Sequence, residues 1–167
     1  EQDNRWMGVL GNLPVIEPVD ARDAQRLVKE AFEISEKFEV PVIFRITTRV
    51  AHSRSDIELA EIEPRRNLPE KFEKNPARFV CVPSTARRNH TRLLGVIREL
   101  QKWAETSDLN REEEGSNKNA GIIASGVSYT YVKEALGELG LDFPILKIGL
   151  SYPLPEDLIG NFLQKFD

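Results

Sequence analysis

The sequence predicts an α/β fold built from parallel strand–helix–strand units. Short apolar runs that are typical of buried strands alternate with stretches whose apolar residues recur every three or four positions, as in amphipathic helices. Prolines and glycines stand at the boundaries between these segments. A strand–helix–strand crossover implies parallel strands, so we expect ligands to bind beyond the carboxyl ends of the strands.

The first predicted unit begins with a short apolar segment between prolines. Residues 13–18 are interpreted as a brief buried strand. Asp20 is a favourable N-cap for a helix that runs to about Phe38, because apolar side chains repeat at helical spacing along it. Pro41 ends that pattern, and the β-branched residues of 42–47 predict the second strand.

The middle of the chain has a different composition. Residues 61–69 contain two prolines and mixed charges, so we interpret residues 57–118 as a linker that carries an amphipathic helix near 84–105. Ser84 is the predicted N-cap of that helix. Residues 105–118 are acidic and poor in apolar side chains, which predicts an exposed, mobile loop.

A second α/β unit follows from Asn119. Residues 120–125 are predicted to be a buried strand, Gly126 a turn and Ser128 the N-cap of a helix that ends at Gly140. Residues 144–149 predict the next strand, and prolines after it open a last helix.

Two strands rarely form a stable sheet alone, so we expect this chain to be a piece of a longer protein, with exposed apolar patches where further strands would pack. The only methionine is Met7, and the chain opens on five polar residues, which also indicates an earlier natural start.

Composition excludes several classes of protein. The chain has 167 residues, and its 27 acidic and 23 basic residues give a net charge of −4, which provides no electrostatic reason to bind nucleic acid or an anionic membrane. No apolar run approaches the roughly 20 residues that cross a bilayer. A single cysteine, Cys81, fits a reducing, cytoplasmic setting.

The densest polar cluster follows the second predicted strand. It comprises Thr47, Thr48, Arg49, His52, Ser53 and Arg54. Hydroxyl, imidazole and guanidinium groups at the carboxyl end of a strand could bind a carboxylate or a polar ring. The alternative is a solvated loop that hydrogen-bonds to itself and to a neighbouring subunit.

Other chemically versatile residues fit structural roles. Cys81 follows the strand-like residues 78–80 and is predicted to be a small buried side chain, and His90 is predicted to lie on a helix surface. The spacing of Gly121 and Gly126 does not match a dinucleotide-binding turn. The chain contains no phosphate loop, GxSxG or HExxH motif, so no catalytic residue and no metal ligand is assigned.

The order of these segments resembles that of thiamine-diphosphate enzymes. The stretches that carry this likeness are residues 14–20, 41–49, 121–128 and 145–155. The first two resemble the closing half of a pyrimidine-binding domain, and the last two resemble the start of a transketolase C-terminal domain. The resemblance therefore assigns residues 1–56 to the C-terminal part of the first domain and residues 119–167 to the N-terminal part of the second.

Within that superfamily, the chain is similar to the alpha subunits of indolepyruvate:ferredoxin oxidoreductases, a family of 2-oxoacid oxidoreductases. The similar stretches are residues 1–5, 47–54, 76–83 and 121–129, and they follow the family's order. The resemblance implies that thiamine diphosphate attacks the keto carbon of an aryl pyruvate, that carbon dioxide leaves, and that coenzyme A accepts the acyl group. Electrons then pass through 4Fe-4S clusters to ferredoxin.

The resemblance also implies a beta subunit and magnesium, which holds the diphosphate. In the family, the glutamate that activates thiamine lies upstream of Glu1 and the magnesium motif lies downstream of Asp167, while the cluster cysteines are absent here. We therefore expect this stretch alone to bind no cofactor and to be inactive.

The family's motifs place two groups of residues near the site. Gln2, Asn4 and Arg5 match the end of a loop near thiamine or the substrate. Thr48, Arg49, His52 and Ser53 match a loop at a domain or subunit interface, or at the substrate rim.

Two alternatives stay open. One is a transketolase-like subunit without iron–sulfur clusters. The other is a non-catalytic α/β interaction module that docks through the amphipathic helix of residues 87–100.

Overall fold

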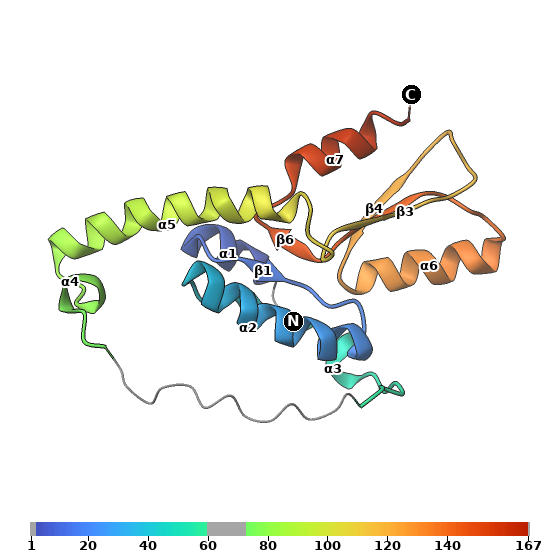
Figure 1. Ribbon diagram of the computed structural model, residues 1–167. Coiled ribbons are helices and arrows are strands. Elements are labelled where there is room, and N and C mark those ends of the chain that lie inside the picture. Colours follow the sequence, from blue (N-terminus) through green and yellow to red (C-terminus); the bar gives the residue numbers. More distant parts are fainter. Residues whose placement is uncertain (1–2, 60–72, 167) are drawn as a thin grey trace.

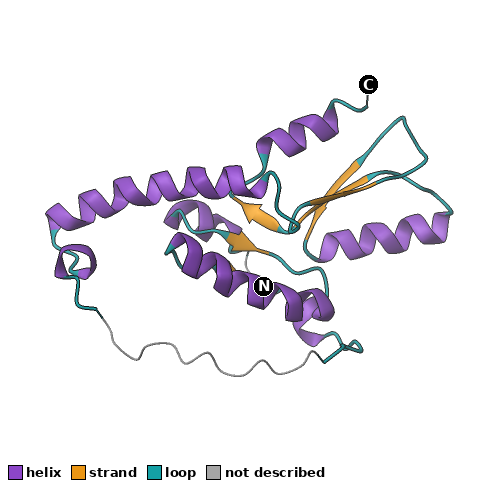
Figure 2. Ribbon diagram, in the orientation of Figure 1, coloured by secondary structure: helices purple, strands orange, loops and turns teal. Residues whose placement is uncertain are grey.

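The computed structural model describes residues 3–59 and 73–166. In this part of the chain, seven helices and six short strands form a mixed α/β structure with two three-stranded sheets (Figure 1). Helices α1, α2 and α5 surround strand β1 in one half, and helix α6 lies beside strands β3 and β4 in the other (Figure 1). Most of the ordered structure is helical, with the strands between the helices (Figure 2).

The first sheet has the order β2-β1-β6. Strand β1 (Val15–Ile16) pairs in parallel with β2 (Ile43–Phe44), and α2 (Ala21–Phe38) is the crossover between them, which confirms the predicted parallel unit. Both strands are shorter than predicted from 13–18 and 42–47. Prolines before and after β1 lack the N–H that a longer ladder needs.

Helix α2 is built as its sequence pattern predicts. The Asp20 carboxylate accepts a hydrogen bond from the backbone N–H of Asp23 at 2.7 Å and so caps the helix. The apolar face of α2 buries Leu27, Ala31 and Ile34. These residues pack in one core with buried residues of α5 (Pro83–Ala104), so the amphipathic helix predicted near 84–105 is confirmed.

The N-cap predicted for α5 is wrong. The helix begins at Pro83 with Val82 as N-cap, and Ser84 lies inside its first turn. Proline is favoured at the first helical position because its φ is already helical and its missing N–H has no partner there.

The second sheet has the order β3-β5-β4. Strands β4 (Ile122–Ser125) and β5 (Ile145–Ile148) are parallel, as predicted, and α6 (Val127–Leu139) connects them. Helix α6 starts after Gly126, whose φ is 51°, and not at Ser128, while Gly140 ends it in the left-handed conformation as predicted. Helix α7 (Glu156–Leu163) follows and packs Phe162 against β5.

The prediction of an exposed, mobile loop at 105–118 is wrong. Strand β3 (Arg111–Glu113) pairs antiparallel with β5 inside this segment. Just before it, Leu109 and Asn110 are buried, and the Asn110 side chain bonds to three backbone groups, which belong to Ala104, Gly149 and Leu150. The acidic composition predicted a loop, but the backbone groups of these charged residues pair with β5 and form an edge strand.

Strand β6 (Leu150–Tyr152) connects the two sheets. It follows β5 after one residue, Gly149, and pairs antiparallel with β1 of the first sheet. Gly149 lies close to the backbone of Leu109, which precedes β3. A Cβ added at Gly149 would meet the Leu109 carbonyl oxygen at 2.4 Å. The last third of the chain therefore completes the sheet that the first third begins.

Three short helices were not predicted. Helix α1 (Arg5–Gly11) follows the polar N-terminal residues, and α3 (Thr48–His52) forms within the predicted polar loop. Helix α4 (Pro76–Phe79) includes Arg78 and Phe79, which were expected to be strand-like. No described helix is both long and apolar enough to span a membrane.

Candidate functional site

A buried ion pair lies where β1 and β2 end. Glu17 directly follows β1, and Arg45 directly follows its parallel neighbour β2, so their side chains meet at the carboxyl edge of the sheet. Arg45 Nη1 donates to Glu17 Oε2 at 2.7 Å. The two side chains are only 3% and 11% exposed for Glu17 and Arg45. Each of these buried charges offsets the desolvation cost of the other, and either one alone would be strongly destabilising.

The Arg45 guanidinium also bonds to the N-terminal polar residues. Its Nε donates to Asn4 Oδ1 at 2.9 Å, and its Nη2 lies 3.8 Å from Asp3 Oδ1. The Asp3 carboxylate in turn accepts hydrogen bonds from the Arg5 side chain and backbone, which hold the pKa of Asp3 far below its usual range. We call these five residues, Asp3, Asn4, Arg5, Glu17 and Arg45, the Arg45 network.

One oxygen atom of the Arg45 network is a hydrogen-bond acceptor without a donor. Glu17 Oε1 is buried and has no hydrogen-bond partner among the residues that the structure describes. A buried, unpartnered carboxylate oxygen is costly in a folded protein, and a ligand, an ion or a catalytic role can account for one.

The beginning of α6 lies against the same edge of the first sheet. A Cβ at Gly126 would lie 3.2 Å from Glu17 Oε2. Thr130 donates its hydroxyl to the Val19 carbonyl at 3.1 Å, and the Tyr131 ring lies 5.9 Å from the Arg49 guanidinium carbon. The two α/β units thus meet beside the Arg45 network.

A second buried ion pair joins the two units at their interior. Lys147 of β5 donates to the Asp23 carboxylate of α2 at 3.0 Å, with both side chains at most 10% exposed. Burial by itself raises the pKa of Asp23, but the Lys147 ammonium and the hydrogen bonds from Val19 and Arg26 outweigh it and lower the pKa. This pair stabilises the contact between α2 and the second sheet.

A more exposed cluster surrounds Glu113 of β3. Tyr129 donates to it at 2.5 Å, and Lys133 and Arg111 lie at 2.9 and 3.2 Å. Burial and the hydrogen bond to Glu113 raise the pKa of Tyr129. All of these side chains are paired with one another, which is typical of a structural tie between β3 and α6.

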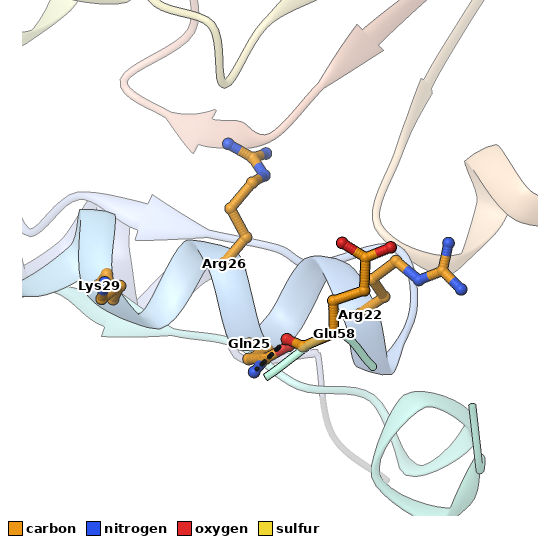
Figure 3. A pocket seen from close by; sticks show the side chains of 5 residues that line it. All are labelled: Arg22, Gln25, Arg26, Lys29 and Glu58. Carbon is orange, nitrogen blue, oxygen red and sulfur yellow. Dashed lines mark hydrogen bonds between the residues drawn. The ribbon is translucent and has the colours of Figure 1, made fainter. Parts of the chain in front are cut away.

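A basic groove runs along the outer face of α2. Its volume is about 500 Å³, and Figure 3 shows its lining: Arg22, Gln25, Arg26, Lys29 and Glu58. Arg22 donates to the Asp56 carbonyl and Gln25 to the Glu58 carbonyl, so these side chains hold the segment after α3 against the helix. Arg26, which lines the groove, also donates to the Asp23 carboxylate at 3.0 Å.

Comparison with known proteins gives relatives along the whole chain. The indolepyruvate oxidoreductase subunit IorA of Methanothermobacter marburgensis is 45% identical over 167 residues, an alignment that covers 98% of this chain and 26% of that protein. IorA of Archaeoglobus fulgidus is 39% identical over 165 residues, which cover 99% of this chain and again 26% of the relative. Along nearly its full length, the chain is similar to indolepyruvate oxidoreductase subunits.

The resemblance in the residue motifs is therefore confirmed, and the chain spans about a quarter of the length of these IorA relatives. The similarity extends to a second subunit family: 2-oxoglutarate synthase subunit KorA of Archaeoglobus fulgidus is 27% identical over 176 residues, which cover 96% of this chain and 50% of KorA. No protein-family model matches the chain.

The structure brings only some of the expected site residues of this chain together. Asn4 and Arg5 belong to the Arg45 network, whereas Gln2 lies outside the described residues. Thr48, Arg49, His52 and Ser53 lie in or directly after α3. Arg49 contacts Tyr131 of α6, and Ser53 donates to the Val50 carbonyl as part of the helix end. His52 is exposed.

Two residues of the site were missed from the sequence. Glu17 and Arg45 were each read as part of a strand segment, although both are charged residues at the carboxyl end of a predicted strand. That position was the available signal, because parallel strands bring their carboxyl ends to one edge of a sheet.

Of the remaining predictions for single residues, one is confirmed and one is wrong. His90 lies exposed on α5, as predicted. Cys81 is exposed and not buried, because it lies in the turn between α4 and α5 and not in a strand. Within residues 3–59 and 73–166, no group of three or more His, Cys, Asp or Glu side chains could hold a metal ion.

Proposed function

We propose that this chain is the part of a thiamine-diphosphate-dependent 2-oxoacid:ferredoxin oxidoreductase subunit that forms one wall of the active site. The whole enzyme would convert aryl pyruvates such as indolepyruvate to acyl-coenzyme A and pass the electrons to ferredoxin. The observation that carries this proposal is the 45% identity to an indolepyruvate oxidoreductase subunit along nearly the full chain. The position of the Arg45 network beyond the ends of parallel strands supports it.

The proposal includes a division of the chain. Residues 1–56 would be the C-terminal part of a pyrimidine-binding domain, residues 57–118 a linker that includes α5, and residues 119–167 the start of a transketolase C-terminal-like domain. The two parallel pairs support this division, since β1 with β2 and β4 with β5 are each joined by a crossover helix of their own.

Asn4 and Arg5, together with Gln2, would contribute polar contacts to thiamine or the substrate. Their support is the network itself, which holds a guanidinium and an amide at the edge of the sheet where α/β proteins bind ligands. Thr48, Arg49, His52 and Ser53 would lie at a domain interface or the substrate rim. The contact of Arg49 with Tyr131 of the second unit favours the domain interface.

The described residues fit the rim of a thiamine site, because an unpartnered buried carboxylate oxygen and two arginines stand together at the sheet edge. Among them, no group of three or more His, Cys, Asp or Glu side chains could hold a metal ion. When bound, thiamine diphosphate supplies the nucleophilic carbon for decarboxylation of a 2-oxoacid. The role of Arg5 and Asn4 would be to bind and orient polar groups of the cofactor or substrate.

Enzyme kinetics of the full-length subunit assembled with its beta subunit test the proposal. We expect indolepyruvate-dependent reduction of ferredoxin that requires coenzyme A, and Arg5→Ala should reduce kcat/KM at least about tenfold, as the loss of a charged hydrogen bond to cofactor or substrate does. Arg111→Ala, which removes an exposed arginine of β3, is the control and should leave kcat/KM unchanged.

Two results would contradict the proposal. An assembled enzyme that converts no 2-oxoacid would favour the non-catalytic interaction module instead. Unchanged kinetics in Arg5→Ala would remove residues 3–5 from the site.

A further inference from the structure

We propose that Glu17 is a positioning residue that holds the polar residues Asp3, Asn4 and Arg5 in place through Arg45, and that the Gly126 turn of the second α/β unit sets the position of Glu17. This inference rests on the proposed function of residues 3–5 at the cofactor and substrate rim. It assigns a role to three residues, Glu17, Arg45 and Gly126, that no motif in the sequence singled out for the site.

The first step is the contact between Glu17 and Arg45. Their ion pair of 2.7 Å is almost fully removed from solvent, so competition from water and screening by salt are weak. An arginine side chain has many rotamers, and a buried carboxylate at this distance selects one of them.

The second step is the contact of the other Arg45 guanidinium nitrogens with Asn4 and Asp3. With Nη1 bound to Glu17, Nε points to Asn4 and donates to its side-chain oxygen at 2.9 Å, while Nη2 lies 3.8 Å from Asp3. The guanidinium is planar and rigid, so a bond that restrains one nitrogen also restricts the directions of its other N–H groups. The position of Asn4 therefore depends on Glu17, although the two residues share no direct hydrogen bond among those of the described residues.

The third step is the role of Gly126. Glu17 Oε2, the oxygen that accepts from Arg45, lies where a Cβ at residue 126 would approach to 3.2 Å. Such a contact is tighter than ordinary packing, so any larger residue would push the carboxylate toward or away from Arg45. Gly126 also has φ 51° and ψ −145°, a conformation open mainly to glycine. The start of α6 thus defines one wall of the Glu17 position.

The test separates positioning from simple stability by comparing single and double variants of the assembled full-length enzyme. Glu17→Gln removes the buried counter-ion of Arg45 and leaves only the more distant Asp3, and we expect both a lower melting temperature and at least a tenfold loss of kcat/KM for indolepyruvate. The double variant Glu17→Gln with Arg45→Gln removes both charges, so we expect its melting temperature to recover toward that of the native protein. Its kcat/KM should stay at least tenfold low, because Asn4 has lost its donor.

Glu112→Gln is the matched control, since it neutralises a glutamate in a surface ion pair with Lys165 and should change neither quantity. Gly126→Ala should lower kcat/KM as Glu17→Gln does. Gly140→Ala, at a second glycine with positive φ but with open space around it, should not.

Recovery of kcat/KM together with the melting temperature in the double variant would overturn the positioning role, because a purely structural pair behaves that way. Amide hydrogen exchange of residues 3–11 in the full chain gives a readout that does not depend on turnover. Faster exchange in Glu17→Gln supports the proposal even if the enzyme acts on no 2-oxoacid, in which case only the proposed function fails. Unchanged exchange would overturn the inference.

Discussion

Two buried carboxylates with different partners show how single residues stabilise this chain. Glu17 is held by an arginine of the same sheet, while Asp23 is held by Lys147, which lies on the other sheet. The Asp23–Lys147 contact therefore bridges the two α/β units, and its partners are 124 positions apart. No local pattern could have paired them.

Replacing Lys147 by Met should destabilise the chain by about 3 kcal/mol, because the Asp23 carboxylate loses its buried cation and keeps only the more exposed Arg26. Urea denaturation measures this change in the free energy of unfolding. The double variant Lys147→Met with Asp23→Leu should lose clearly less than the single variant. Lys165→Met, which breaks a half-exposed pair, should cost below about 1 kcal/mol.

The same pair predicts a dependence of stability on pH. The pKa of Asp23 is lower in the folded chain than its ordinary value of 3.8, so the ionised form is favoured by folding. Its contribution to stability is then complete above the unfolded pKa and is lost as the pH falls through the folded pKa.

Denaturation at a series of pH values from about 6 downward should show that Asp23→Asn has a smaller loss of stability than the native chain over this acidic range. Equal slopes in the two proteins would show that Asp23 does not titrate differently on folding.

At the level of elements, several helix ends were predicted from local signals alone. Asp20, the apolar spacing of α2 and Gly140 act within one or two turns of backbone, so the sequence pattern alone locates these helix ends. Strand β3 consists of charged residues and forms only because β5 offers its backbone groups. Helix α3 likewise forms in a segment whose composition indicated a loop, where the Thr47 side chain accepts from the Val50 N–H.

Asn110 is expected to be the residue on which the position of β3 depends most. Asn110→Ala would remove an acceptor from the Gly149 and Leu150 N–H groups and a donor from the Ala104 carbonyl, all in buried surroundings. We expect a loss of about 2–3 kcal/mol in unfolding free energy, measured by chemical denaturation.

Asn110→Asp retains the acceptor and loses only the donor, and it should therefore lose less stability than Asn110→Ala unless the new charge is itself too costly to bury. A variant Asn110→Ala as stable as the native chain would contradict the assigned role.

For the molecule as a whole, much apolar surface is exposed on the described residues. Trp6 and Leu10 of α1 are 72% and 81% exposed, and Phe32 of α2 is 70% exposed. Exposed apolar side chains are therefore present, here on helices; whether further strands would pack on them stays a prediction. Exposed apolar side chains that gather on one short helix favour association.

We predict that the chain by itself associates at micromolar concentrations and that Trp6→Gln with Leu10→Gln reduces this association. Static light scattering measures the effect, and Lys29→Gln, which changes an exposed polar side chain on α2, is the control. A native chain that remains monomeric would show that the apolar face of α1 does not drive association.

The alternation of apolar and polar residues was enough to predict the α/β class, the two parallel units, the amphipathic helices and the edge of the sheet where a site belongs, because these depend on periodicity and on caps that act over a few residues. Motif resemblance was enough for the subunit family. Only the tertiary structure decided that β6 returns to the first sheet, that β3 completes the second, and that Glu17, Arg45 and Gly126 meet. These features depend on hydrogen bonds and close contacts between residues far apart in the chain. Such contacts produce no repeating pattern in the sequence.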